Sequence, residues 1–202
     1  MRFDLMQHGE AARRIVEASW RAIARAGIRK FRVTDVASDA GVSVGLVYYH
    51  FTDRNGLLQA TMDHANRMTA IAGGIPDQDG RRSDGCGFDR LAELLLADMS
   101  GTPTMRDNAV VWQELMGEAL FEAGIRDEVN ATLVDWQENV RSTIADGQAD
   151  GSIRSDVDAE TAARVLTALV DGLLSRITIG SLSWDAAGLA LRSAMDGLLR
   201  PA

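Results

Sequence analysis

The chain has 202 residues, 46% of them apolar, which is enough to bury a sizeable core without disulfides or metal. It carries one cysteine, which excludes an intrachain disulfide and leaves no zinc-ligand spacing. No stretch approaches the roughly 18 uncharged apolar residues of a membrane span, and the first residues form no apolar signal segment, so we expect a cytoplasmic protein.

The net charge of −8 is distributed unevenly along the chain. Residues 1–58 hold nine Lys or Arg and six Asp or Glu, a net +3, whereas residues 59–202 hold twelve and twenty-three, a net −11. A basic N-terminal part on an acidic remainder fits a protein that presents one end to nucleic acid. Because +3 is modest, the positions of these charges decide the question.

The first predicted helix spans residues 8–26, where apolar and small side chains recur at three- and four-residue spacing. Gly27 supplies a helix C-cap. Phe31 is then expected to fill the core of a small domain, while Lys30 and Arg32 beside it reach the DNA backbone. Four arginines lie largely off the apolar stripe and either form a solvated face or, for one or two of them, contact phosphate; they are Arg13, Arg14, Arg21 and Arg25.

The stretch TDVASDAGVSVGLVYYHFTDR predicts two short helices joined by a tight turn. They cover about residues 34–40 and 44–50. Thr34 and Ser43 can cap the two helix starts through their side-chain oxygens, and Gly41 can adopt the left-handed conformation that ends the first helix. The outward side of the second helix is polar, small or aromatic, which suits a helix-turn-helix with its second helix in a DNA major groove.

The rest of the chain is also predicted to be helical, because no alternating runs are bounded by turn signals. Asp53 is expected to start a long helix that ends near residue 72, followed by a polar, Gly-rich loop at residues 77–87. The fold class is therefore all-α. The later helices are expected at residues 88–99, 105–123, 126–149, 158–179 and 184–199, with Gly124 ending the second of them.

The last two predicted helices carry more apolar surface than one core contact needs. They also contain Gly172, Gly188 and Gly197, which are best tolerated where two backbones approach closely. We therefore predict that these helices pair with their copies into a four-helix bundle; alternatively, the chain folds these faces into its own core. The predicted dimer contacts are Leu166, Val170, Leu173, Ile177, Leu191, Ala194 and Leu198.

Apolar and aromatic side chains in the middle helices either line a ligand cavity or simply fill the core, since helical spacing fits both. Gln113, Glu114 and Asp171 could add polar contacts to such a cavity. Three scattered histidines and one cysteine form no metal motif, and we expect neither metal nor cofactor. The candidate lining residues are Met99, Trp112, Met116, Phe121, Trp136 and Leu169.

The residues from Thr34 to Leu57 strongly resemble the DNA-binding domain of the tetracycline-repressor (TetR) family. With the first helix and Gly27, the likeness covers about residues 8–62. Further on, the run D-G-S-I-R-x-D-x-D is similar to the ligand-binding half of the betaine-regulator-like subgroup. The matching positions are Thr34, Ala37, Ala40, Gly41, Val42, Ser43, Gly45, Val47, Tyr48, Tyr49, His50, Phe51, Arg54 and Leu57.

The resemblance implies a homodimeric transcriptional regulator, usually a repressor released by a small ligand, and no enzymatic activity. A helix-turn-helix head of three helices, residues 1–55, would be joined by a fourth helix to a ligand-binding and dimerisation body, residues 56–202. The implied partners are double-stranded operator DNA, a second copy of the chain and a small-molecule effector. The residues that the resemblance assigns to DNA are Thr34, Ser43, Gly45, Leu46, Tyr48, Tyr49, His50 and Arg54.

Four positions differ from the usual family pattern. Leu46 stands where members often have a short polar residue, so it is expected to touch a thymine methyl group or to pack inward. Arg54 replaces the usual Lys and is expected to hold a phosphate. Asn55 and Gly56 replace strong helix formers, so the first turn of the fourth helix is expected to be soft.

The expected mechanism places two recognition helices of a dimer in successive major grooves, about 34–36 Å apart. A ligand in the body would shift the fourth helix and weaken operator binding. A helical enzyme and a helical partner-binding scaffold are the alternatives, and specific, steeply salt-sensitive DNA binding separates a regulator from both.

Overall fold

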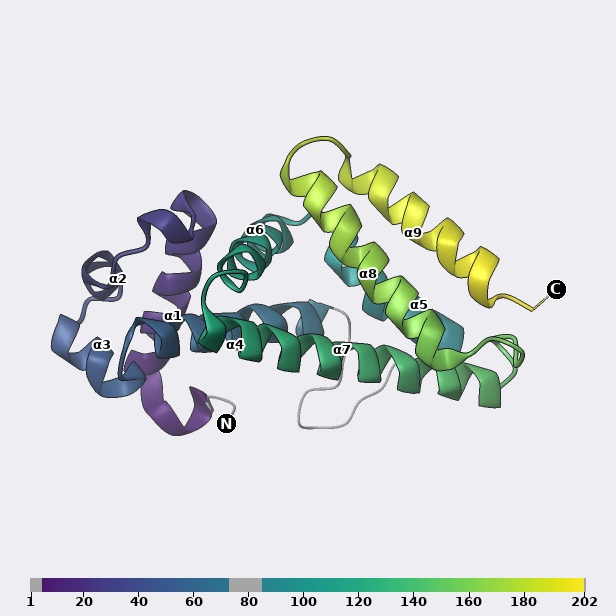
Figure 1. Ribbon diagram of the computed structural model, residues 1–202, viewed down its shortest axis with the longest axis horizontal. Helices are drawn as coiled ribbons and strands as arrows, with labels where there is room; N and C mark the ends of the chain where they lie inside the picture. Colours follow the sequence, from purple (N-terminus) through teal and green to yellow (C-terminus); the bar gives the residue numbers. More distant parts are fainter. Residues whose placement is uncertain (1–4, 73–84, 202) are drawn as a thin grey trace. The chain divides into compact units, whose positions relative to one another are not determined.

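The structure is a computed structural model that describes residues 5–72 and 85–201, and all regular secondary structure in these residues is helical (Figure 1). The prediction of an all-α fold is confirmed. No helix in this part of the chain combines the length and apolar character needed to cross a membrane.

The described residues form two compact units, and the chain passes between them within three of its helices. The first unit contains the residues up to Met68 together with Arg106–Asn130. The second contains Thr69–Met105 and the residues from Ala131 onward, as far as each is described. This division does not follow the predicted functional boundary at residue 55, which stays a prediction.

The first unit is built on α1, which runs from Leu5 to Ala26 and is kinked at Gly9 (φ 77°). Phe31 is buried, as predicted, together with apolar residues of α2 and α3. The helices of this unit are α1 (Leu5–Ala26), the short 3-10 helix η1 (Ile28–Lys30), α2 (Val33–Asp39), α3 (Val44–Phe51), most of α4 (Arg54–Ala72), most of α6 (Pro103–Glu118) and the start of α7 (Ala123–Ala149).

The turn between α2 and α3 has the predicted form. Gly41 has φ 65°, and the Ser43 hydroxyl oxygen accepts a hydrogen bond from the Leu46 N–H at 3.2 Å. The predicted cap at Thr34 is wrong, because α2 begins one residue before it. Arg32 is the extended N-cap residue, its carbonyl oxygen accepts from the N–H groups of Asp35 and Val36, and no side chain caps the helix.

Asn108 of α6 supplies a buried polar link within the first unit. Its side-chain oxygen accepts from the Trp20 indole at 3.0 Å, and its amide donates to the Ala65 carbonyl oxygen at 3.1 Å. His64 lies edge-on to Trp20, with ring centroids 6.1 Å apart, and burial lowers its pKa. The imidazole is therefore neutral near pH 7. Through Asn108, α6 is hydrogen-bonded to both α1 and α4.

The second unit contains α5 (Gly87–Leu96), the 3-10 helix η2 (Ala97–Met99), most of α7, α8 (Ala159–Thr178) and α9 (Trp184–Leu199). Helix α9 packs against α8, α5 and η2. Asp158 caps α8 as predicted, since its side chain accepts from the Thr161 N–H. The fully buried large side chains of this unit include Phe88, Leu91, Leu95, Ile144 and Ile153.

The predicted role of Gly124 is wrong, because α6 already ends at Glu118 and Gly124 lies within α7. The Arg126 guanidinium holds the turn that follows α6. It donates to the carbonyl oxygens of Ala119 and Leu120 at 2.9 and 2.8 Å. These carbonyls lie beyond the end of α6, so an arginine of the following helix satisfies backbone groups that no helix hydrogen bond reaches.

Candidate nucleic-acid interface

Helix α3 divides sharply into a buried side and an exposed side. Val47 and Phe51, four residues apart, are buried, as helical periodicity requires of a face packed on the core. Tyr48 and Tyr49 point the other way and are 45% and 81% exposed, and Gly45 is exposed beside them. Large aromatic side chains held outward by a well-packed short helix are suited to contact a partner rather than to fill a core.

The other α3 residues predicted to meet DNA lie between these extremes. Leu46 and His50 are partly exposed, so Leu46 is not withdrawn into the core. The His50 ring stands edge-on to Tyr49, with ring centroids 5.3 Å apart, and is 6.0 Å from the ring of Phe51. The exposed Ser43 hydroxyl is engaged in capping the helix.

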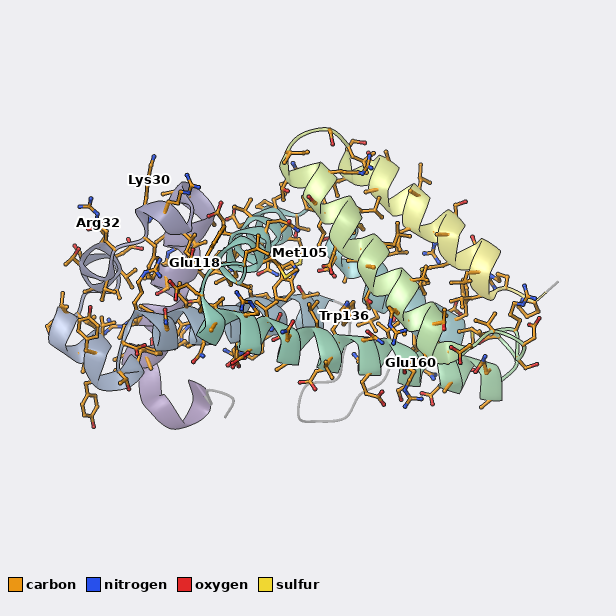
Figure 2. The ribbon with its side chains drawn as sticks, in the orientation of Figure 1. Lys30, Arg32, Met105, Glu118, Trp136 and Glu160 are labelled. Atoms are coloured by element: carbon orange, nitrogen blue, oxygen red, sulfur yellow. The ribbon has the colours of Figure 1, made fainter. Side chains whose placement is uncertain are left out.

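Exposed positive charge also lies between α1 and α2, at the end of η1 and at the N-cap of α2. Lys30 and Arg32 are exposed, and Figure 2 shows both side chains extending away from the ribbon. The arginines of α1 are differently engaged, because Arg21 and Arg25 pair with Asp39 of α2 at 3.3 and 3.8 Å. Arg21 and Arg25 therefore form a structural contact between two helices, whereas the contact of Lys30 and Arg32 with the DNA backbone stays a prediction.

Arg54, which is predicted to hold a phosphate, makes several contacts within the first unit. Its guanidinium lies 3.3 Å from the Glu118 carboxylate and donates to the Ile28 carbonyl oxygen at 3.4 Å. It also lies over the Phe31 ring, 5.7 Å from its centroid. Sequence reasoning missed Glu118, because no local pattern relates positions 54 and 118.

Gly56 makes a tight turn possible at the start of α4. Its N–H donates to the Asp53 carboxylate at 2.8 Å, which confirms Asp53 as the cap of this helix. A Cβ at position 56 would overlap the Phe51 carbonyl oxygen. The glycine therefore satisfies a steric requirement of the turn in this chain.

Two family models match the chain. One, described as bacterial regulatory proteins of the tetR family, covers residues 15–61, and the other, described as the C-terminal part of BetI-type transcriptional repressors, covers residues 88–200. The chain belongs to the TetR family. It is a DNA-binding transcriptional regulator and not an enzyme.

Individual TetR proteins support the assignment. The chain is 27% identical over 169 residues to the HTH-type transcriptional regulator TtgR of Pseudomonas putida, covering 83% of this chain and 80% of that protein. A TetR-family regulator from Rhodococcus sp. has a crystal structure that matches with TM-score 0.85 and 36% identity, over 94% of this chain and all (100%) of that one. A regulator from Saccharomonospora viridis, solved in complex with choline, matches with TM-score 0.79 and 28% identity, over 95% and 98% of the two chains.

Five of the seven residues predicted to contact a partner chain are buried within the single chain, where α9 packs against α8 and α5. They therefore have little surface left to offer a second copy. Ala194 and Leu198 are partly exposed. The alternative, that the chain folds these faces into its own core, holds for the five buried residues, which are Leu166, Val170, Leu173, Ile177 and Leu191.

The predicted pocket residues have mixed environments. Phe121 is 83% exposed in the turn between α6 and α7, which does not fit the wall of an enclosed cavity. Glu114 contacts the backbone of η1, so it is already engaged within the first unit. Met99 is buried, and four others are partly exposed, so their lining of a pocket stays a prediction: Trp112, Met116, Trp136 and Leu169.

Asp98, in η2 of the second unit, is the most strongly perturbed acid in the described residues. Burial raises its pKa to about 7, the charge of Asp171 raises it further, and a hydrogen bond with Thr69 opposes the rise. The two carboxyl groups therefore lie close enough to influence each other. No cluster in the described part of the chain has the ligands for a metal ion.

Asp98→Asn is expected to make the free energy of unfolding less sensitive to pH. The folded-state pKa of Asp98 is about 7, above its ordinary value of 3.8, so the folded protein retains a proton that the unfolded chain loses. Stability from this group is present at low pH and is lost as the pH rises through about 7. The loss begins above the ordinary pKa of 3.8 and is complete only above about 7, so urea unfolding should show the variant gaining stability relative to wild type by less at about pH 5 than at about pH 8. Asp127→Asn, at an exposed position, is the control; an equal change in both variants would contradict the assignment.

Proposed function

We propose that the protein is a homodimeric repressor that binds a palindromic operator through α3 and is released by a small-molecule effector. The observation that carries the proposal is the outward display of Tyr48 and Tyr49 on α3, in a chain of the TetR family that also exposes Lys30 and Arg32. The description of the C-terminal family model as a BetI-type repressor favours repression. We propose that the protein acts in the cytoplasm, where such a regulator meets DNA.

The test is selection of a binding duplex from a random-sequence pool by the full chain. A palindromic consensus bound by two copies of the chain, with affinity falling steeply as salt increases, is the expected result. Binding that shows no sequence preference, or a single copy on an asymmetric site, would contradict the proposal. In a cell, deletion of the gene should raise transcription from promoters that carry the consensus, and a fall would indicate activation instead.

We propose that the dimer surface is the exposed side of α8 and α9, in place of the buried residues considered above. This side carries apolar and small side chains that a protein interior would accept. Gly172 lies on it and has no atom within 4 Å of its Cβ position, so a second backbone can approach closely there. The exposed residues concerned are Val165, Ala168, Gly172, Ile179, Leu189 and Ala190.

Ala168→Glu is expected to shift the protein from dimer to monomer. Each dimer would bring two new carboxylates into the interface, and juxtaposed like charges cost several kcal/mol. Light scattering after size exclusion should report about half the wild-type mass at the same concentration. Ala131→Glu adds the same charge at an exposed position of α7 and is expected to leave the mass unchanged. A fully dimeric Ala168→Glu variant would show that the dimer interface does not include this side of α8.

The effector is proposed to be a small organic cation bound in the second unit. The structure of the Saccharomonospora viridis relative contains choline, and the second unit of this chain brings the carboxyl groups of Asp98 and Asp171 near each other. The negative charge of these acids would attract a bound cation and repel a bound anion. Choline added to the complex with the selected duplex is expected to lower its affinity, and an unchanged affinity at every concentration would remove choline as a candidate.

A further inference from the structure

The C-terminal half of α6 directs two carboxylates at the DNA-binding domain, all within the first unit. Glu114 accepts a hydrogen bond from the Ile28 N–H at 2.7 Å. Glu118, one helical turn later, pairs with Arg54 at 3.3 Å, and Figure 2 marks it on α6. The acidic side chains therefore contact the domain at two places, one on its backbone and one on a cation.

The two contacts differ in what they can exchange. The Glu114 carboxylate lies against Gly27, where a Cβ would be 3.1 Å from its oxygen, and its partner is the backbone N–H of Ile28. The Arg54 and Glu118 side chains remain 38% and 22% exposed. A pair that water already reaches can be broken without leaving a buried charge unpaired. Glu114 is thus a fixed attachment, whereas Glu118 holds a cation that another anion could take.

Arg54 is the first residue of α4 and follows α3 after a short turn. A planar guanidinium binds a phosphate with the same geometry that it uses for a carboxylate. We propose that Glu118 competes with DNA for Arg54: it holds the guanidinium in the free protein, and operator binding replaces it by a backbone phosphate. This inference rests on the proposed function, because it requires that α3 docks on DNA.

The exchange makes DNA affinity depend on α6. Whenever α6 brings Glu118 closer to Arg54, the cation is withdrawn from phosphate, and whenever the pair loosens, the cation becomes available. Glu118 is therefore a positioning residue for DNA binding that touches no DNA itself.

The test compares Glu118→Gln with wild type on the duplex selected by the wild-type chain. Freed from its carboxylate, Arg54 should raise the affinity at low salt by about two- to fivefold, the size expected of one partly exposed ion pair. The slope of log affinity against log salt should also steepen by up to about one. In wild type, Arg54 leaves the Glu118 carboxylate when it binds a phosphate, and the freed carboxylate attracts a counterion from solution. The variant has no carboxylate at this position, so this uptake of a counterion does not occur. Glu122→Gln removes an equal charge at an exposed position four residues later and should change both quantities less.

A cycle with Arg54→Gln identifies the route. If Glu118 acts through Arg54, Glu118→Gln has no effect on affinity in the Arg54→Gln background. A persistent gain there would show general repulsion of DNA and overturn the inference. A lowered melting temperature without any gain in affinity would reduce the pair to a structural contact and also overturn it. Wild type that selects no duplex would defeat the proposed function and this inference together, whereas wild-type binding without a gain in Glu118→Gln defeats the inference alone.

Discussion

Gly45→Asp is expected to abolish detectable operator binding while leaving the protein folded. Gly45 lies in the first turn of α3, is exposed, and has space for a side chain, since only the Ser43 hydroxyl comes within 4 Å of its Cβ position, at 3.8 Å. An acidic residue in the first turn of a helix is favourable to the helix itself. On the face proposed to enter the groove, however, it meets the phosphates of both strands.

The expected loss of affinity is at least about 100-fold, because juxtaposed like charges cost several kcal/mol and the dimer carries two copies of the substitution. Fluorescence anisotropy on the selected duplex measures it. Gly45→Asn has nearly the same size and no charge, so it separates repulsion from steric hindrance and should lose much less. Circular dichroism of both variants should match wild type. Wild-type affinity of Gly45→Asp would show that α3 is not the helix in the groove.

Local signals predicted most of the helical boundaries. The side chains of Ser43 and Asp158 each accept a hydrogen bond from an N–H group in the first turn of the helix that follows. Gly41 adopts the left-handed conformation after the end of α2. Each of these residues acts on its immediate neighbours in the chain, so its role can be predicted from local sequence. The α9 bounds, Trp184–Leu199, were predicted without error. The prediction that Thr34 caps α2 was wrong because the helix begins at Val33, with Arg32 as its extended N-cap residue. The residue with the better capping side chain therefore lies inside the helix.

Contacts between segments that are distant in the chain could not be predicted from the sequence. Glu118 and Arg54 are far apart in the chain, and nothing local distinguishes Glu118 from a solvated acid. The buried apolar residues of α8 present the same difficulty. Helical periodicity identifies an apolar stripe, but it does not say whether the chain or a second copy covers it. The chain itself covers Leu166 and Val170, whereas Val165 and Ala168 lie on another side of the same helix and remain exposed.

The second unit depends on a close approach of α5 and α7 that no sequence pattern announced. Gly87, the first residue of α5, lies directly against Gly147 of α7, and a Cβ on Gly87 would overlap the backbone of Gly147. The contact also positions the helix start. The Gly87 N–H donates to the Asp150 carboxylate at 2.6 Å, and the Phe88 N–H donates to the Ser152 hydroxyl at 3.0 Å. Hydrogen bonds from Ser152 and the Gly87 backbone lower the pKa of Asp150, so this cap is charged near pH 7.

Gly87→Ala is expected to destabilise the protein by roughly 1–3 kcal/mol, and by more if α5 cannot move, because overpacking forces two backbones apart. The separation would also lengthen both hydrogen bonds to the start of α5. Urea unfolding of the full chain measures the change. Gly117→Ala is the matched control: it lies in α6 with no atom within 4 Å of its Cβ position, so alanine there should be neutral or stabilise by up to about 1 kcal/mol. Equal stability of the two variants would mean that α5 and α7 do not meet at these glycines. A loss confined to Gly87→Ala would establish that the packing of the second unit requires a residue without a side chain at this crossing.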